Sequence, residues 1–475
     1  MKHDYPELTL AARFERQFQA SRIRPVVPLA LRRDRLRRLQ AVLEVNGERL
    51  ADAARADFGA RSHEVTRLSE LVPLQWELHH ALRHLRNWMR SRRVRTPLQL
   101  QPARAHLMPQ PLGVVGVIAP WNYPISLALG PSIAALAAGN RVLLKPSELT
   151  PHTAACLAQC LAMHFELEEF DVIQGDITVA SAFSALRFDH LVFTGSPAVA
   201  RKIAAAAAAN LVPTTLELGG KSPCLIDSAA DFASVMPAIV NGKLLNCGQT
   251  CIAPDYVLLP RGREADFVQA FNATVQRFYP QIVGNPDYTA LLDERGLARM
   301  LSLLYDAQDQ GARVIQVGVR ATEKSDSVQR RQLPPTLVLD TRPQMRVMQE
   351  EIFGPILPIV PYDTLDEAIA YINAGPRPLA LYWFGNDSAR TKKVLSETVS
   401  GAAVMNETLL HFAHANLPFG GVGESGWGAY HGEAGFLRLS HLKPVFRQLR
   451  WNASSLLHPP YGPGMRRILD MLARW

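Results

Sequence analysis

Apolar residues recur at helical spacing, with few breakers, through residues 8–95. This spacing predicts a helical N-terminal region. From Leu112 onward the pattern changes to short apolar runs separated by segments of helix length. Such alternation is typical of buried strands and helices in βαβ units around a parallel sheet. The predicted strands cover residues 113–118, 140–145, 170–173 and 190–193, and the predicted helices cover residues 125–138, 151–165 and 198–210.

The same alternation resumes after Glu217. Residues 320–333 interrupt it with polar and charged side chains, which indicates an exposed loop. We therefore predict an α/β protein with two doubly wound parallel-sheet regions that divide near residue 216. In the second region the predicted strands cover residues 222–226, 256–259 and 357–360, and the predicted helices cover residues 264–279 and 291–310.

Residues 96–111 follow a third pattern, in which polar and apolar residues alternate and four prolines occur before Gly113. Prolines break helices and avoid the centre of a sheet. The segment is therefore predicted to be an extended excursion, in the form of a β-hairpin that leaves the main body.

Composition supports a large globular protein. The chain has 475 residues, of which 48% are hydrophobic and 20% are charged, enough for a large core in two or three domains. Its cysteines are scarce and odd in number, five in all, which argues against a disulfide framework and favours a reducing, cytoplasmic setting. The N-terminus has no apolar secretory region, and no apolar run has the length of a membrane span.

The formal net charge is +8, and arginines cluster in residues 13–38 and 83–95. We interpret these clusters as solvated helix faces, because nucleic-acid binding also needs aromatic or glycine-rich interleaving, which is absent. Weak attraction to anionic ligands or membranes stays open. Residues 465–475 are basic and amphipathic; docking on the protein's own body is favoured over a partner subunit or peripheral membrane contact, because so short a segment has little membrane affinity.

Two cysteines separated by small or polar residues, Cys247 and Cys251, are the main chemical feature. Upstream, Glu217 lies between apolar residues and precedes two glycines, a setting that suits a base near a thiol. A thiol and a carboxylate suggest covalent catalysis through sulfur. Free cysteines also serve as small buried hydrophobes, as expected for Cys156 and Cys160 at helical spacing rather than in a metal site.

Two turns at predicted strand ends are candidate cofactor contacts. Gly195 and Ser196 stand between a strand and a helix, where small residues and a helix N-terminus suit a phosphate, although the six-residue glycine fingerprint is missing. Lys145 and Glu148 follow an earlier strand and could hydrogen-bond a ribose. A plain turn with a surface ion pair is an equally good interpretation of the second turn.

Three further segments contain residues suited to ligand contact. The amide of Asn122, flanked by prolines in residues 120–124, could stabilise a developing oxyanion. Residues 350–355 combine two acids, an aromatic and a Gly-Pro turn, and residues 416–426 form a glycine-rich loop that permits close backbone approach. Taken singly, each segment also fits a structural turn.

Together these segments resemble the aldehyde dehydrogenase superfamily, in the same order and at similar spacing, over about residues 10–445. The most specific of them are residues 216–223, 246–256 and 417–422. The forms of residues 246–256 and 428–432 are similar to the class 3 branch, which includes fatty, aromatic and coniferyl aldehyde dehydrogenases.

The resemblance implies a role for each candidate residue. Cys251 matches the nucleophile, Glu217 the general base and Asn122 the oxyanion-binding amide, whereas Cys247 has no implied catalytic role and is expected to pack or to be sensitive to oxidation. The implied cofactor contacts are Lys145 and Glu148 at the adenosine ribose, Gly195 and Ser196 at the pyrophosphate, Glu351 at the nicotinamide ribose, Phe353 beside the nicotinamide, and Trp121.

Pro197 and Ala200 depart from the family pattern, in which threonine and glycine are common at these positions. Alanine is still small enough for close packing of a helix on a sheet, so cofactor binding is expected to survive. The cofactor implied is NAD, with NADP as the alternative, because Glu148 would repel a 2′-phosphate and Lys145 would attract it. No metal is needed for the implied chemistry.

The resemblance also implies an architecture. Residues 1–93 and 111–216 would form the cofactor-binding domain and residues 217–408 the catalytic domain. A bridging and oligomerisation element of a homodimer would comprise residues 94–110 and 409–445, and residues 446–475 would be a C-terminal tail.

The implied reaction is NAD(P)-dependent oxidation of an aldehyde to the carboxylic acid, through a thiohemiacetal and a thioester on Cys251. The expected substrate is coniferyl or another aromatic aldehyde, and the alternative is a medium- or long-chain aliphatic aldehyde. Glu217, as a base for water, argues against a CoA-acylating dehydrogenase. The presence of both Cys251 and Glu217 argues against an inactive structural homologue.

Overall fold

Six strands form the first sheet of the computed structural model, which describes residues 8–318, 324–451 and 458–473. The strand order is β15-β7-β6-β3-β4-β5, and all neighbours pair in parallel except β15, which is antiparallel to β7. The strands are β3 (Val114–Ile118), β4 (Arg141–Lys145), β5 (Phe170–Val172), β6 (His190–Gly195), β7 (Thr214–Leu218) and β15 (Gly426–Trp427).

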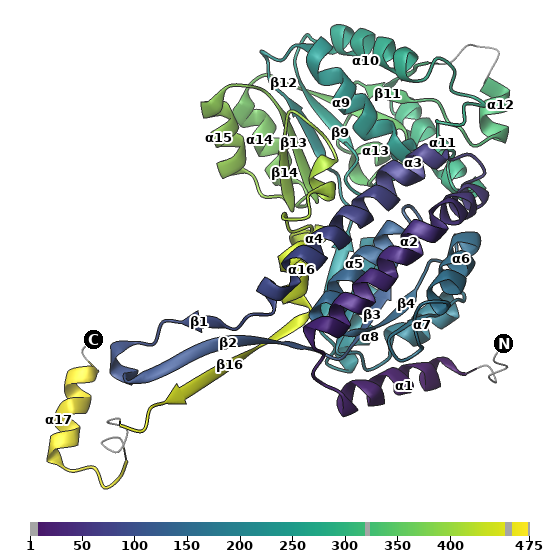
Figure 1. Ribbon diagram of the computed structural model, residues 1–475. Coiled ribbons are helices and arrows are strands. Elements are labelled where there is room, and N and C mark those ends of the chain that lie inside the picture. The colour runs from purple at the N-terminus through teal and green to yellow at the C-terminus, as the bar shows by residue number, and fades with distance from the viewer. Residues whose placement is uncertain (1–7, 319–323, 452–457, 474–475) are drawn as a thin grey trace.

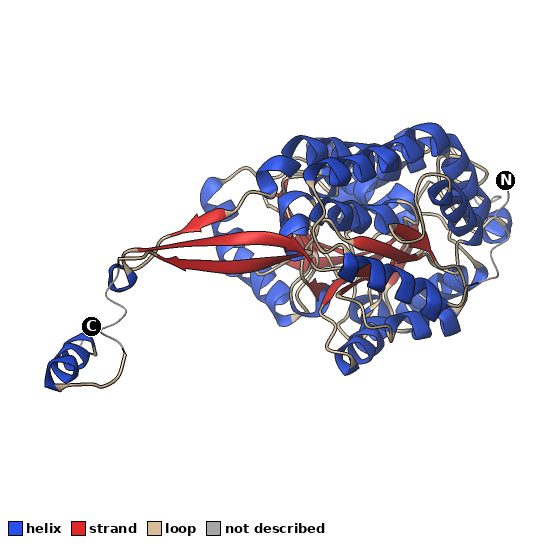
Figure 2. Ribbon diagram, turned by 60° about the horizontal axis from the view of Figure 1, so that its bottom comes forward, coloured by secondary structure: helices blue, strands red, loops and turns tan. Residues whose placement is uncertain are grey.

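Helices cover both faces of this sheet (Figure 2). Alternate residues of β3 show why: Val115 and Val117 pack in one apolar cluster with α2, α4, α5 and α6, whereas Val114 and Ile118 pack in another with α1, α7 and α8. Side chains on a strand alternate between faces, so a strand apolar throughout is buried on both sides. The helices are α1 (Leu10–Ile23), α2 (Leu29–Phe58), α3 (His63–Thr66), α4 (Val72–Trp88), α5 (Ser126–Ala138), α6 (Pro151–Ala162), α7 (Ile177–Ser184) and α8 (Pro197–Ala209).

The second sheet has seven strands in the order β10-β11-β12-β9-β8-β13-β14, parallel except for β10. Its strands are β8 (Pro223–Ile226), β9 (Tyr256–Pro260), β10 (Arg313–Gln316), β11 (Thr336–Leu339), β12 (Ile356–Tyr362), β13 (Ala380–Phe384) and β14 (Ala402–Met405). The accompanying helices are α9 (Phe232–Leu244), α10 (Glu264–Phe278), α11 (Glu294–Asp309), α12 (Lys324–Gln329), α13 (Arg346–Gln349), α14 (Leu365–Ala374) and α15 (Ser388–Glu397).

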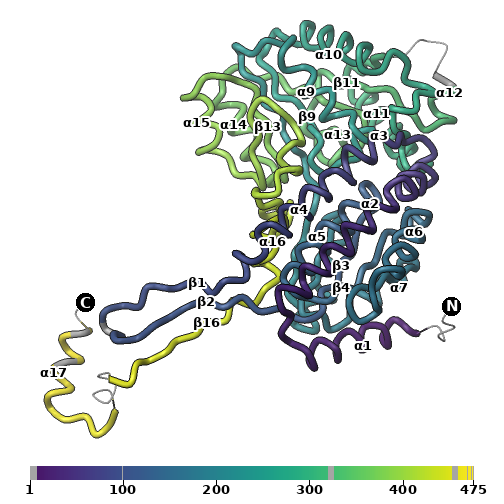
Figure 3. Tube along the Cα trace, viewed as in Figure 1, coloured from purple at the N-terminus to yellow at the C-terminus, as the bar shows by residue number. Residues whose placement is uncertain are grey.

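A three-stranded antiparallel sheet projects from the body as an arm (Figure 1). Its strands are β1 (Arg92–Val94), β2 (Ala103–Pro111) and β16 (Ser440–Gln448). The trace in Figure 3 shows β2 and β16 running side by side although they come from opposite ends of the chain. Helix α16 (Gly432–Arg438) leads into β16, and α17 (Pro463–Leu472) follows it.

The structure confirms the predicted fold class, with two doubly wound sheets and a small β element. Several details of the prediction are wrong. The helical region predicted for residues 8–95 ends before strand β1 (Arg92–Val94), and the helix predicted to reach residue 165 ends at Ala162. Residues 324–329 of the predicted loop form helix α12, and the helix predicted from residue 291 begins at Glu294. Strand β7 crosses the boundary predicted between residues 216 and 217, because β7 pairs with β6 through Leu218.

Two further corrections concern the C-terminal tail. Strand β16 continues to Gln448, so the predicted tail from residue 446 begins inside the arm. The expectation that the basic segment docks on the protein's own body is also wrong for its described part. Helix α17 lies beyond the end of the arm, away from both large sheets (Figures 1 and 2).

Candidate active site

A cleft of about 660 Å³ opens at the carboxyl ends of β3, β6 and β7. In doubly wound sheets ligands bind outside the carboxyl ends of the strands. The second sheet's connecting segments, including the loop after α9, close the cleft from the other side. The sequence-predicted residues that line it are Trp121, Asn122, Gly195, Ser196, Glu217, Cys251, Glu351 and Phe353.

The loop between α9 and β9 separates the two cysteines. Asn246, Cys247 and Gly248 have consecutive positive φ angles of 51°, 57° and 72°, which non-glycine residues rarely adopt. A side chain on Gly248 would clash with the carbonyl oxygen of Gly354. The turn leaves Cys247 fully buried and brings only Cys251 into the cleft.

Burial, together with the nearby carboxylates of Glu351 and Glu217, raises the pKa of the Cys251 thiol to about 12. The backbone N–H groups of Cys251 and Ile252 act in the opposite direction but are outweighed. At neutral pH the thiol is protonated, so attack requires a base to accept its proton.

Glu217 lies on β7, opposite Thr194 of β6 and Gly426 of β15. Its side chain is 1% exposed, and neither carboxylate oxygen has a hydrogen-bond partner among the described residues. Burial raises the pKa of this carboxyl group well above its usual value. A buried carboxylate without partners is costly, and such groups cluster where a carboxyl group exchanges protons during catalysis.

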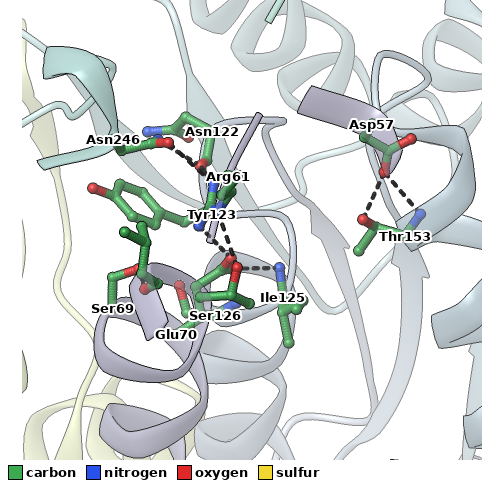
Figure 4. A network of polar contacts seen from close by, with 12 residues as sticks. Asp57, Arg61, Ser69, Glu70, Asn122, Tyr123, Ile125, Ser126, Thr153 and Asn246 are labelled. Atoms are coloured by element: carbon green, nitrogen blue, oxygen red, sulfur yellow. Dashed lines mark hydrogen bonds and ion pairs between the residues drawn. The ribbon is translucent and has the colours of Figure 1, made fainter. Parts of the chain in front are cut away.

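Asn122 is held against the loop that carries Cys251 (Figure 4). Its amide Nδ2 donates to the Gln249 carbonyl oxygen at 3.1 Å. Its own carbonyl oxygen accepts from Nη1 of Arg61 and from Nδ2 of Asn246, both at 2.9 Å. Both the side-chain amide and the backbone carbonyl of Asn122 are thus held by hydrogen bonds, and two of these bonds come from the loop that carries Cys251.

The segment that carries Glu351 and Phe353 is held by residues that the sequence reasoning missed. Asp255 accepts from the Ile352 N–H at 2.8 Å and pairs with Lys221, which also donates to the Glu350 carbonyl at 3.0 Å. The local sequence around Lys221 and Asp255 does not predict this contact, because the contact joins distant parts of the chain.

Two arrangements place the predicted nicotinamide contacts. The carboxylate of Glu351 lies against Gly219, where any Cβ would overlap it, and burial raises its pKa to about 8. Phe353 adopts a φ of 53°, and its ring lies edge-on to Trp121 with centroids 5.4 Å apart. Arg299 secures this turn by donating to the Ile352 carbonyl at 2.6 Å.

The start of α8 faces the cleft. Ser196 caps the helix by accepting from the Val199 N–H, and Gly195, Ser196 and Arg201 all line the cleft. A helix N-terminus with small residues and a nearby cation suits a diphosphate. Ala200 is buried against the sheet as expected for close packing.

Lys145 and Glu148 lie outside the lining of the cleft, at the carboxyl end of β4 next to β3. The Lys145 ammonium is buried, donates to the Pro146 carbonyl at 2.8 Å and lies 3.6 Å from the carboxylate of Glu148. Burial lowers the pKa of Lys145. The Glu148 side chain is 42% exposed, so a ligand can reach it.

An aromatic cluster packs beside Cys251 in the same apolar core. The Phe419 ring stacks on His431 at 5.6 Å and meets Phe412 edge-on at 5.0 Å, and Tyr430 meets His431 edge-on at 4.7 Å. Tyr382 joins it to the cysteine loop by donating to the Ile252 carbonyl. The sequence reasoning missed this cluster because its members come from a loop with no regular spacing.

Comparison with known protein families identifies one that covers most of the chain. The model of the family described as "Aldehyde dehydrogenase family" matches residues 15–445. The chain belongs to the aldehyde dehydrogenase family. The predicted family is therefore confirmed.

Relatives of this aldehyde dehydrogenase support the class 3-like branch. A probable coniferyl aldehyde dehydrogenase of Pseudomonas aeruginosa is 46% identical over 463 residues, which cover 98% of this chain and 96% of that protein. Aldehyde dehydrogenase family 3 member A2 of Pongo abelii is 39% identical over 94% of this chain and 90% of its own length.

Solved structures agree with the fold. A substrate-bound structure of Staphylococcus aureus AldH superposes with a TM-score of 0.91 at 35% identity, covering 98% of this chain and all of that one. Mycobacterium tuberculosis aldehyde dehydrogenase in complex with NAD+ superposes with a TM-score of 0.81 at 27% identity, covering 93% and 90% of the two chains.

Two other kinds of feature are absent from the described residues. Across residues 8–318, 324–451 and 458–473, no helix combines the length and apolarity needed to cross a membrane. Within the same ranges, no group of three or more His, Cys, Asp or Glu side chains is placed to hold a metal ion.

Proposed function

We propose that this aldehyde dehydrogenase oxidises aromatic aldehydes of the coniferyl type to carboxylic acids, with Cys251 as nucleophile and Glu217 as base. One observation carries the proposal: Cys251 and the unpartnered carboxyl group of Glu217 line the same cleft, beside the amide of Asn122. The combination of thiol, base and oxyanion donor is what covalent oxidation of an aldehyde requires.

The cleft fits a nicotinamide dinucleotide. Its volume suits a cofactor of that size, the start of α8 suits a diphosphate, and Gly219 leaves the space that the carboxylate of Glu351 occupies. Gly195, Ser196, Glu351, Phe353 and Trp121 would hold the cofactor inside the cleft, and Lys145 and Glu148 would contact its far ribose. When bound, NAD accepts a hydride and so supplies the oxidising equivalent.

The protein's own residues perform the remaining steps. Glu217 accepts the thiol proton as the Cys251 sulfur bonds to the aldehyde carbon. The amide of Asn122 and the backbone N–H of Cys251 stabilise the oxyanion of the thiohemiacetal. After loss of the hydride a thioester remains on Cys251, and Glu217 gives up its first proton to solvent. Its carboxylate then takes a proton from the water that adds to the thioester and returns it to the departing Cys251 sulfur, so that the acid leaves and the thiol is restored.

The rings of the aromatic cluster lie outside the lining of the cleft, but they belong to the apolar core against which Cys251 packs, and this setting favours a planar ring at Cys251. The relatives named coniferyl aldehyde dehydrogenases, including that of Pseudomonas sp. at 47% identity, point the same way. We expect kcat/KM for coniferyl and other aromatic aldehydes to exceed that for aliphatic aldehydes by at least about tenfold, about 1.4 kcal/mol of transition-state binding.

A panel of aromatic and aliphatic aldehydes, assayed with NAD and with NADP, measures this preference. Higher kcat/KM for medium- or long-chain aliphatic aldehydes would contradict the proposed substrate class. Acyl-CoA formation in place of the acid, when CoA is supplied, would contradict hydrolysis through Glu217.

We expect NAD to be preferred over NADP because the exposed carboxylate of Glu148 repels a 2′-phosphate. Glu148→Gln should raise kcat/KM for NADP by roughly 5- to 10-fold, since two like charges a few ångströms apart in water cost about 1 kcal/mol. Steady-state kinetics with both cofactors measure the change. Glu166→Gln, an exposed carboxylate in the loop before β5, is the control and should leave the ratio unchanged. An unchanged ratio in Glu148→Gln contradicts the assignment.

We also propose a cytoplasmic homodimer joined through the arm. Exposed Val94, Leu98 and Phe446 support this, because a projecting sheet that presents large apolar side chains is suited to association. Sedimentation velocity distinguishes a dimer from a monomer.

A further inference from the structure

The Arg61 guanidinium contacts Asn122, one of the residues that line the candidate active site, and is fully buried in an ion pair (Figure 4). Its Nη2 donates to the Glu70 carboxylate at 2.7 Å, and its Nε donates to the Thr66 hydroxyl at 3.1 Å. A buried ion pair is weak evidence for stability, because well-packed apolar residues often serve as well. The question is therefore what else the guanidinium contacts.

The remaining nitrogen of Arg61 joins two loops from different sheets. Nη1 donates to the Asn122 carbonyl oxygen at 2.9 Å and to Oδ1 of Asn246 at 3.2 Å. Asn122 follows β3 of the first sheet, whereas Asn246 precedes Cys251 in the second. One nitrogen atom thus spans the two segments that would supply the oxyanion donors.

The Glu70 carboxylate extends this contact past Asn122. Its Oε2 accepts from the backbone N–H groups of Ile125 and Ser126, at 2.7 and 2.9 Å. These groups open helix α5, so they have no partner within the helix itself. The ion pair therefore holds the chain at the Asn122 carbonyl and again three residues later.

Asn246 completes a closed set of hydrogen bonds. Its Nδ2 donates to the carbonyl oxygens of Asn122 and Gln249, at 2.9 and 3.3 Å, and the Asn122 amide donates to the same Gln249 oxygen. Asn246 needs these contacts to retain its positive φ, which is strained for a residue with a Cβ. Arg61 is thus part of the closed set of hydrogen bonds that joins Asn122 to the Cys251 loop.

We propose that Arg61 is a positioning residue that sets the separation between the Asn122 amide and the backbone N–H of Cys251. The proposal rests on the proposed function, in which these two donors bind the oxyanion. Arginine is required because its planar fork reaches four partners in fixed directions, which a lysine ammonium on a flexible stem cannot do. Arg61 touches neither reacting atom and acts only through the two loops.

Arg61→Lys tests this role in the full-length enzyme. Displacement of an oxyanion donor by about 1 Å costs on the order of 100-fold in rate. We expect the rate of the first turnover, normalised to sites counted by active-site titration, to fall by about that factor. NAD affinity, measured by fluorescence titration, should change less than about twofold, because no cofactor contact is moved.

Arg35→Lys is the matched control. Arg35 is also buried and pairs with Glu169 at 2.9 Å. It lies at the amino ends of β4 and β5, whereas the cleft lies at the carboxyl ends of the strands. Its substitution should lower thermal stability and leave the per-site rate unchanged. If Arg61→Lys behaves in the same way, Arg61 is only a structural ion pair and the proposal is wrong.

Arg61→Met combined with Glu70→Gln covers the case in which the single variant does not fold. It removes both buried charges and retains an acceptor for the Ile125 and Ser126 N–H groups, so it should fold and still show the reduced first-turnover rate. A normal per-site rate in this variant overturns the proposal. Absence of aldehyde oxidation by the wild-type protein, or full turnover by Cys251→Ala, instead overturns the proposed function together with this role.

Discussion

Replacing Cys251 with alanine should abolish aldehyde oxidation, with a loss of kcat on the order of 10⁵-fold, the scale observed when a covalent nucleophile is removed. The alanine side chain offers no atom that can bond to the aldehyde carbon. Cofactor binding should persist, because Cys251 contributes little to the surface that holds the dinucleotide. Initial rates and NAD titrations measure the two effects separately.

Cys247→Ala is the control for Cys251→Ala. Cys247 is fully buried, and its sulfur lies 3.8 Å from the Tyr288 hydroxyl. Its removal should leave kcat within a few fold and lower the free energy of unfolding by about 1–2 kcal/mol, because a small cavity remains. Turnover by Cys251→Ala within about tenfold of the wild type would exclude Cys251 as the nucleophile.

Glu217→Gln should separate the two halves of the reaction. An amide cannot accept a proton from water, so hydrolysis of the thioester should slow by roughly 10²- to 10⁴-fold, the usual contribution of a general base. The first turnover should be slower too, because Glu217 also accepts the thiol proton, but a burst of reduced cofactor should remain visible as long as hydrolysis is slowed more. Stopped-flow absorbance with excess aldehyde measures both phases.

The pH dependence of Glu217 has a definite sign. Burial raises the pKa of the carboxyl group, and only its ionised form accepts a proton. The steady-state rate should therefore rise with pH as Glu217 ionises and be lost as pH falls through its pKa. Glu217→Gln should lack this inflection. Glu351→Gln, which alters another carboxyl group of the cleft, is the control and should weaken cofactor binding without slowing hydrolysis. If Glu217→Gln hydrolyses the thioester at the normal rate, Glu217 is not the base.

The fold could be predicted wherever the apolar pattern had one explanation. The apolar run predicted as a buried strand over residues 113–118 forms β3 (Val114–Ile118), which is buried along its whole length. Helix α12 was missed because its six residues, KSDSVQ, carry no apolar stripe. The place of α17 was missed because an amphipathic segment shows which of its faces is apolar, not what that face meets.

Some residues of the candidate site could likewise be predicted from the sequence, and others could not. Cys251, Glu217 and Asn122 could be proposed because each stands in a short, specific segment next to a predicted strand. Arg61 and Asp255 could not, because their contacts join residues far apart in sequence. The sequence also gave no warning that burial would raise the pKa of Cys251, since that shift comes from three segments meeting in space.

The late position of β15 in the sequence delays completion of the first sheet during synthesis. All strands of the first sheet except β15 have been translated by Leu218, yet the free edge of β7 is covered only by Gly426 and Trp427. Until then the edge strand that carries Glu217 presents unpaired backbone groups, which invite association with other nascent chains. Glu217, the proposed general base, thus reaches its final surroundings only near the end of translation, and fragments that stop before residue 426 should be both inactive and prone to aggregate.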